Sequence, residues 1–431
     1  MRTSTLKTIP DVENFKNQLL NWSQQFREVI FLDSNSKSNS SQNYSDYDFI
    51  FAIDAFTSIK TDSHNAFQDL NEYQIRTQDW LFGYLCYDLK NDIEDLSSNN
   101  FDGLHFPDLF FFQPKKLFLL KGNQLEICYL NLCDDEVDDD FVQIVNFQKQ
   151  KFDILNLPFI EQKISKKNYL DTVSKILESI NRGDIYEINF CMEFFAQNAI
   201  INPLEIYQKL NAISETPFSV FFKNNYHYLA SASPERYLRK EDTKIISQPI
   251  KGTSKRFKDT IEDEKSKIQL ATDPKELSEN IMIVDLVRND LSHTAEKGSV
   301  QVEELCKVYS FKQVHQMIST ITSHVSHTVS PIDILKTTFP MGSMTGAPKI
   351  SAMEIIENLE VTKRGLYSGA MGYFTPTGDF DFNVVIRSIL YNEKEKYVSF
   401  SVGSAITAAS IPENEYEECL LKANAMLDVL G

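Results

Sequence analysis

Several features that whole classes of protein depend on are scarce or missing in this chain of 431 residues. Positive charge is in deficit, because 43 Lys and Arg stand against 61 Asp and Glu and give a net charge of −18. Nucleic-acid binding rests on clustered Lys and Arg, so the lack of a basic stripe argues against a nucleic-acid partner. No apolar run approaches the ~20 residues that cross a bilayer, and residues 1–18 hold no stretch suited to a signal peptide.

Cysteine chemistry and nucleotide loops are also missing from the sequence. The six cysteines are scattered without CxxC spacing, which indicates reduced, buried side chains and not a zinc or redox site. No Gly-x-Cys-x-Gly segment is present for a glutaminase nucleophile, and no Gly-Lys-Ser/Thr ending is present for a phosphate-binding loop. We therefore expect a cytoplasmic protein with no membrane partner.

What the sequence does contain is typical of a large globular enzyme. Hydrophobic residues make up 42% and aromatic residues 12%, and the length fits about two or three domains. Residues 1–160 hold aromatic-rich runs such as Asp48–Phe56 and Leu117–Leu130, which predict strands. Polar segments at 34–46 and 133–140 predict loops between them. We expect this region to be mostly β.

Residues 161–431 alternate clearer helices with strands. Helical spacing of apolar residues follows Ser165, a candidate cap, and ends at Gly183; the strand Ile185–Cys191 comes next. Further helices are predicted over Glu276–Leu291, Lys349–Leu359 and Asn414–Leu430, and further strands over Tyr228–Ala232, Gly369–Phe374 and Tyr397–Val402. Because no regular βαβ alternation occurs, we predict the α+β class.

Two of these helices each place a pair of carboxylates one turn apart. Glu276 and Glu279 share one helix face, and Glu415 and Glu418 share another. Opposed across a cleft, the two faces would supply the oxygen ligands that Mg²⁺ prefers. The alternative is that each pair belongs to a solvated helix face, which is common in so acidic a chain.

Three single residues carry further chemistry, each with a plainer alternative. Lys251, in a glycine-bearing turn, would be a nucleophile if desolvation lowered its pKa, but most lysines are solvated surface groups. Glu235, at a strand end, suits acid–base work or an ion pair with Arg236. Arg387 ends an apolar run, where its guanidinium needs either a substrate carboxylate or a structural Asp.

A set of motifs, taken in order, resembles the chorismate-utilising enzymes. The match covers about residues 167–431, with a weaker one in IFLDS (30–34), LFGYLCYDL (81–89) and FPDLFFF (106–112). The motifs are GDIYEINF (183–190), SPERYL (233–238), PIKGTSKR (249–256), ELSENIMIVDLVRND (276–290), GSMTGAPK (342–349), RGLYSGAMGY (364–373), DFNVVIRS (381–388) and IPENEYEECLLKA (411–423).

Three reactions compete within that family, and Lys251 discriminates between them. The branch that makes 4-amino-4-deoxychorismate has PIKGT, as here, whereas anthranilate synthases have Ala at the lysine position. The isochorismate group has a water-activating Lys where this chain has Glu187. The resemblance therefore implies an aminodeoxychorismate synthase component I, with anthranilate synthase component I as the main rival. A non-catalytic protein that binds chorismate or tryptophan is the rival from another class.

The resemblance also implies roles for individual residues. Lys251 would form a covalent adduct at ring carbon 2 of chorismate, and Glu235 would serve the 4-oxygen. Mg²⁺ would be held by Glu279 and Glu418, supported by Glu276 and Glu415. Substrate would be bound by Gly252, Thr253, Thr345, Tyr367, Arg387, Gly403 and Lys422.

The implied fold has two antiparallel sheets packed in a core with helices outside, built from an N-terminal region (1–160) and a catalytic region (161–431). The implied substrates are chorismate and ammonia, the latter from a separate glutamine amidotransferase subunit. Two positions depart from the family pattern: the usual histidine falls at Gln316, beside His315, and Glu187 stands where Gln is common.

Overall fold

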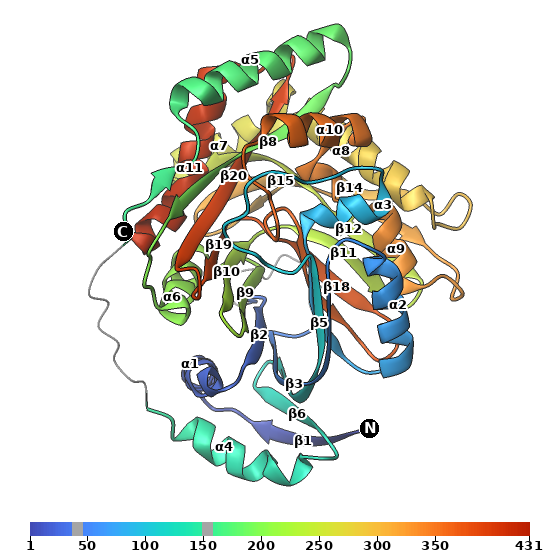
Figure 1. Cartoon of the computed structure of the whole chain (residues 1–431), viewed down its shortest axis with the longest axis vertical. Coiled ribbons are helices and arrows are strands. Elements are labelled where there is room, and N and C mark those ends of the chain that lie inside the picture. Colours follow the sequence, from blue (N-terminus) through green and yellow to red (C-terminus); the bar gives the residue numbers. More distant parts are fainter. Residues whose placement is uncertain (37–45, 149–157) are drawn as a thin grey trace.

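The computed structural model describes residues 1–36, 46–148 and 158–431 (Figure 1). Segments 37–45 and 149–157 lie outside the described residues, so most of the predicted loop 34–46 does too. In the N-terminal region the helices are α1 (Val12–Trp22), α2 (Ala66–Thr77), α3 (Lys90–Ile93) and α4 (Val137–Val145). Its strands are β1 (Arg2–Thr8), β2 (Glu28–Asp33), β3 (Phe49–Thr61), β4 (Leu81–Leu85), β5 (Leu109–Lys121) and β6 (Gln124–Leu130).

The second region, residues 161–431, begins with β7 (Glu161–Gln162) and supplies the remaining elements. Its helices are α5 (Lys166–Arg182), α6 (Pro203–Ser214), α7 (Thr260–Thr272), α8 (Pro274–Ser292), α9 (Pro331–Thr338), α10 (Lys349–Leu359) and α11 (Pro412–Leu430). Its further strands are β8 (Glu187–Ala196), β9 (Phe218–Asn224), β10 (His227–Ser233), β11 (Arg236–Glu241), β12 (Lys244–Gln248), β13 (Ile250–Lys255), β14 (Gln301–Ser310), β15 (Val314–His324), β16 (Gly346–Ala347), β17 (Ala370–Phe374), β18 (Phe380–Val384), β19 (Ser388–Asn392) and β20 (Tyr397–Thr407).

The strands pair antiparallel and carry helices on their outer sides, as the α+β prediction has it (Figure 1). Hydrogen bonds join the strands of both regions into one continuous system, because β2 pairs with β9 and β4 pairs with β17. The division at residue 160 stays a prediction, since segment 149–157 before it is not described.

Two hydrophobic clusters form the core. One lies where α1, α5, α6 and α11 pack on the sheet and includes Phe31, Tyr169 and Phe400. The other lies under α2, α8 and α9 and includes Phe82, Phe111 and Phe382. Helices α5, α8, α10 and α11 gather at one end of the molecule, opposite α1, α4, β1 and β6 (Figure 1).

Local signals predict α5 correctly. The Ser165 side chain accepts a hydrogen bond from the Asn168 N–H, and Gly183 ends the helix at φ +88°. Glycine tolerates this left-handed conformation, so the cap and the stop are both encoded locally.

One prediction in the N-terminal region is wrong. The acidic segment 133–140 is not a loop; it forms a short 3₁₀ turn and the first turn of α4, where carboxylates favour the positive end of the helix dipole. Its Glu136 and Asp140 both contact the Lys116 ammonium. The run Leu117–Leu130, predicted as strand, contains the end of β5 and all of β6, joined by a turn at Gly122.

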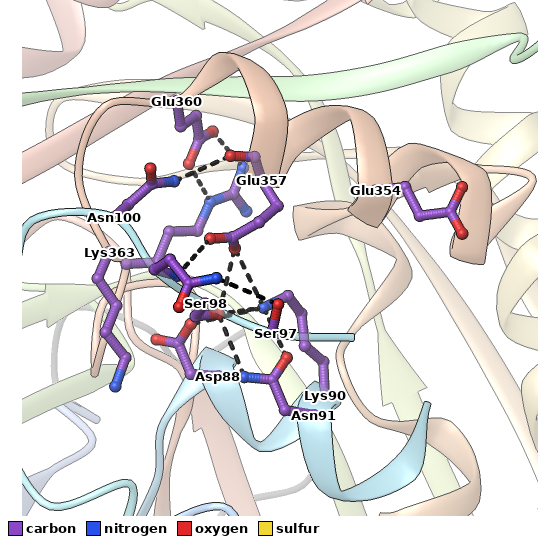
Figure 2. A network of polar contacts seen from close by, with 12 residues as sticks. Asp88, Lys90, Asn91, Ser97, Ser98, Asn100, Glu354, Glu357, Glu360 and Lys363 are labelled. Atoms are coloured by element: carbon purple, nitrogen blue, oxygen red, sulfur yellow. Dashed lines mark hydrogen bonds and ion pairs between the residues drawn. The ribbon is translucent and has the colours of Figure 1, made fainter. Parts of the chain in front are cut away.

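Helix α10 follows the glycine-bearing segment 342–349 and is anchored to the N-terminal region by buried polar contacts (Figure 2). The fully buried Lys90 ammonium donates to the Ser98 hydroxyl (2.5 Å) and reaches Glu357 of α10 (3.4 Å). Ser98 also donates to Glu357, and the Asn100 amide donates to the Glu357 carbonyl. These contacts fix α10, and with it the segment that precedes it.

Candidate active site

The centre of the candidate site is an ion pair between two strands that do not pair with each other, β13 and β8. Lys251 Nζ of β13 donates to Glu187 Oε1 of β8 at 2.6 Å, and both side chains are largely buried. Burial alone would lower the pKa of Lys251, but Glu187, Glu279 and Glu235 raise it above its ordinary value. The premise that desolvation lowers this pKa is therefore wrong for the free protein, because the lysine is buried together with carboxylates.

Glu235 lies in the connection between β10 and β11 and is 4% exposed. Burial raises the pKa of Glu235 to about 7, against the opposing effects of a hydrogen bond from Ser343 and the charge of Lys251. The predicted alternative partner, Arg236, instead binds Asp381 and Gln248. Glu235 thus holds a proton near neutral pH, which suits a general acid.

Arg387 presents a positive charge beside Glu235. Its backbone has φ +51°, a strained conformation for a residue with a side chain, as often found at functional sites. Burial lowers the pKa of Arg387 to about 10, opposed by the charge of Glu235. Among the described residues its guanidinium has no hydrogen bond or ion pair, so no structural Asp takes that role. Its charge acts on Glu235, and part of the side chain remains accessible to solvent.

The two predicted carboxylate pairs lie on α8 and α11 and face one another. Burial raises the pKa of Glu279 to about 7, and it also raises the pKa of Glu276. Glu418 has a lowered pKa despite burial, because Lys422 lies 2.7 Å from its Oε1. Glu415 accepts a hydrogen bond from Ser404 and is 2% exposed.

Lys275 lies between the two pairs. Its ammonium is 3.7 Å from Glu279 Oε1 and 3.3 Å from Glu415 Oε1. In the described part of the chain, no three acidic, His or Cys side chains converge to hold a metal ion as they stand. The donor set nevertheless fits Mg²⁺, since all four ligands are carboxylates and the buried Glu279 Oε1 has no hydrogen-bond partner.

The predicted substrate-binding residues make different contacts in the structure. Gly252 has φ +91°, and a Cβ there would lie 2.9 Å from Glu276 Oε2. The Gly403 carbonyl accepts from Lys422 Nζ at 2.8 Å, and the buried Tyr367 hydroxyl accepts from the Cys191 thiol. The Thr345 hydroxyl donates to carbonyls of its own turn, and Thr253 is exposed.

Comparison with known proteins identifies the family. A family model described as chorismate binding enzyme matches residues 24–428. This chain belongs to the chorismate-binding enzyme family. An aminodeoxychorismate synthase from Arabidopsis thaliana is 37% identical over 72% of this chain, and one from Streptomyces griseus is 38% identical over 63%. The chain spans only 34% and 37% of these two relatives.

Anthranilate synthases are similar over more of their length. Component 1 from Thermus thermophilus is 33% identical over 80% of this chain and 76% of its own. The crystal structure of component I from Streptococcus pneumoniae superposes with a TM-score of 0.78 at 25% identity, covering 88% of this chain and 91% of that one. The menaquinone-specific isochorismate synthase from Escherichia coli has a TM-score of 0.80 at 15% identity over 100% and 94%, and so shares the fold.

The departure at the family's usual histidine position involves the neighbours His315 and Gln316. The His315 ring bonds Asp263 (3.1 Å) and the Ser310 hydroxyl (2.8 Å), so it ties α7 to the sheet. Gln316 is buried, and its side-chain oxygen has no partner among the described residues.

The segment 342–349 is held by strand pairing. Its Gly346–Ala347 portion pairs with β8 beside Glu187, and a Cβ on Gly346 would lie 2.2 Å from the Glu187 carbonyl. Lys349 is held by Asp290 at 2.6 Å, so it is not available to bind an anion.

Sequence reasoning missed Arg364, the buried residue that joins these elements. Its guanidinium donates to both carboxylate oxygens of Glu360 and to the carbonyls of Met344 and Asn189. It thereby links the segment before α10 to β8, the strand that carries Glu187. The Arg-Gly motif identifies the position of Arg364 but does not predict these contacts.

Replacing Arg364 by Met is expected to lower the free energy of unfolding by about 3–5 kcal/mol, because Glu360 is left buried without its partner. Urea denaturation measures this. The matched control is Arg288→Met, which removes an exposed pair with Asp285 and should cost less than about 1 kcal/mol. Equal losses in the two variants would contradict the anchoring role.

No helix of the described residues is long and apolar enough to cross a membrane.

Proposed function

We propose that this member of the family is an aminodeoxychorismate synthase component I, which converts chorismate and ammonia to 4-amino-4-deoxychorismate. The observation that carries the proposal is the buried amine of Lys251, which donates to Glu187 and lies among further acidic groups that include Glu235. The similarity to aminodeoxychorismate synthases supports it. Mass spectrometry of the product formed from chorismate and ammonium tests it.

The proposed chemistry has two substitutions. Neutral Lys251 Nζ forms a bond to ring carbon 2, the two conjugated ring double bonds each shift by one position, and the C4–O bond breaks. Glu235 gives its proton to the departing oxygen, which leaves as water. Ammonia then forms a bond to carbon 4, both double bonds shift back, and the new ammonium returns a proton to Glu235. The C2–N bond breaks and Lys251 leaves as a neutral amine, so the new amine is para to the ring carboxylate.

The substrate carries two carboxylates, and the site offers a cation for each. Arg387, whose guanidinium has no partner among the described residues, is suited to the enolpyruvyl carboxylate, with Tyr367 and the Gly403 backbone. Mg²⁺ held by Glu279 and Glu418, with Glu276 and Glu415, would neutralise the ring carboxylate when bound. Lys422 holds Glu418 and Gly403 in place.

Ammonia is proposed to come from a glutamine amidotransferase subunit. We place the protein in the cytoplasm. Anthranilate synthase component I remains the second candidate, because the chain covers more of those relatives and their fold agrees over most of both chains. Its product would carry the amine at carbon 2. The third alternative, a regulatory protein that binds chorismate or tryptophan, would bind ligand without turnover.

The proposed metal site predicts a loss of Mg²⁺ affinity in Glu279→Gln. One of the carboxylate donors is removed, and the dissociation constant should rise at least about tenfold, the loss typical of outer-shell changes. Titration calorimetry with MgCl₂ measures it without turnover. Glu417→Gln, next to Glu418 on α11 but exposed and paired with Lys166, is the control and should bind Mg²⁺ normally. Normal affinity in both variants would exclude this site.

A further inference from the structure

The ion pair at the centre of the site poses a chemical problem. A protonated lysine has no lone pair, so it cannot attack carbon. The pKa of Lys251 lies above its ordinary value, because the carboxylates around it outweigh the effect of burial. At neutral pH the amine must therefore lose a proton before it reacts.

One group is in position to receive that proton. Glu187 Oε1 is 2.6 Å from Lys251 Nζ, and within the described residues that amine donates to no other side chain. Glu187 is 1% exposed, which excludes bulk water from the pair. Its second oxygen, Oε2, is buried and has no hydrogen-bond partner in the described ranges. The other charged groups facing the amine are Glu235, Glu279, Glu418 and Lys422.

We propose that Glu187 is the base that accepts the proton of Lys251 and returns it at the end of the cycle. The inference rests on the proposed function and deepens it. The Nζ–H bond breaks as an O–H bond forms on Glu187, giving a neutral amine and a neutral acid. After ammonia has displaced the lysine from carbon 2, the same proton passes back to Nζ. No net proton is taken from or given to solvent by the pair.

This role has a distinct pH signature. The ion pair and the neutral pair contain the same number of protons, so their ratio does not depend on pH while the pair keeps that proton. With Gln at position 187, the reactive amine forms only by losing a proton to solvent. Its population then rises about tenfold for each pH unit below the pKa of Lys251.

The test is single-turnover formation of the Lys251 adduct by the full chain, with saturating chorismate and Mg²⁺ and without ammonia. Intact-protein mass spectrometry detects the adduct as a gain of chorismate minus water. Rates are measured between pH 6 and pH 8 for wild type and for Glu187→Gln. Because both proteins share Glu235, Glu279, Glu418 and Lys422, the wild-type-to-variant rate ratio removes their common contributions.

We expect this ratio to fall about tenfold per pH unit as pH rises, with little change in the chorismate concentration needed for half-saturation. Glu193→Gln is the matched control: Glu193 lies on the same strand, is buried, and also has one unpartnered oxygen, but its other oxygen accepts from Tyr397. The wild-type-to-Glu193→Gln ratio of adduct-formation rates should stay constant with pH.

Two results would overturn the inference. A constant ratio for Glu187→Gln would mean that the proton leaves by another route or that Glu187 only holds the lysine in place. If wild type formed no adduct at Lys251, the proposed function would fail together with the role of Glu187. If wild type formed the adduct but the ratio stayed constant, only the role of Glu187 would fail. Thermal unfolding of each variant confirms that it is folded.

Discussion

Replacing Lys251 by Ala is expected to lower formation of 4-amino-4-deoxychorismate by at least ~10³-fold. The reason is that the alanine side chain removes the nucleophile itself, and losses of this size or greater follow removal of a covalent catalyst. With ammonia as the remaining nucleophile, any residual product should carry its amine at carbon 2. Liquid chromatography with mass spectrometry separates the two isomers.

Lys251→Ala also leaves Glu187 buried without its partner, which by itself would destabilise the protein. The double variant Lys251→Ala, Glu187→Gln removes both charges and controls for this effect. It should regain stability in urea denaturation but remain inactive. If the double variant regained activity, the lysine would have only a structural role.

Replacing Glu235 by Gln should lower the rate of adduct formation by about 10²–10⁴-fold, the usual contribution of a general acid. Glutamine keeps the shape and neutrality of the protonated acid but cannot give a proton to the departing oxygen. In wild type the rate should fall above pH 7, where Glu235 loses its proton, and this fall should be absent in the variant. Glu241→Gln, exposed at the far end of β11, should leave the rate unchanged.

The raised pKa of Glu235 also predicts how the stability of the protein depends on pH. This pKa rises from an ordinary 4.5 to about 7 on folding, so between these pH values the folded protein holds this proton more tightly. Stability is therefore lost as pH rises through this window, by about 3 kcal/mol in full. Glu235→Gln should gain stability relative to wild type at pH 8 but not at pH 4. A relative stability independent of pH would contradict the buried, protonated state.

Local structure is predictable where the signals are local. Ser165 and Gly183 bound α5 because a cap and a left-handed stop depend only on adjacent backbone. The acidic segment 133–140 has the composition of a loop, and the lysine that it contacts, Lys116, is on another element. The hairpin at Gly122 gives little sequence signal because both strands are apolar and the turn is short.

The residues of the candidate site can be found from sequence motifs, but the contacts between their side chains cannot. Glu187 and Lys251 are 64 positions apart on strands that do not pair with each other, so only the tertiary fold brings their side chains together. Lys275 of α8 contacts Glu279 on its own helix and Glu415 on α11, and the second of these contacts is encoded by no local pattern. Sequence alone therefore identifies the charged groups, and the fold determines which of them neutralise one another.

The position of the new C–N bond tests the central claim most directly. The protein is incubated with chorismate, Mg²⁺ and ammonium at mildly alkaline pH, and the product is identified by mass spectrometry. A parallel sample contains an aminodeoxychorismate lyase, which converts the expected product to para-aminobenzoate. We predict para-aminobenzoate in that sample, and none with Lys251→Ala. Anthranilate formed by wild type and equally by Lys251→Ala would contradict the account and identify the chain as an anthranilate synthase component I.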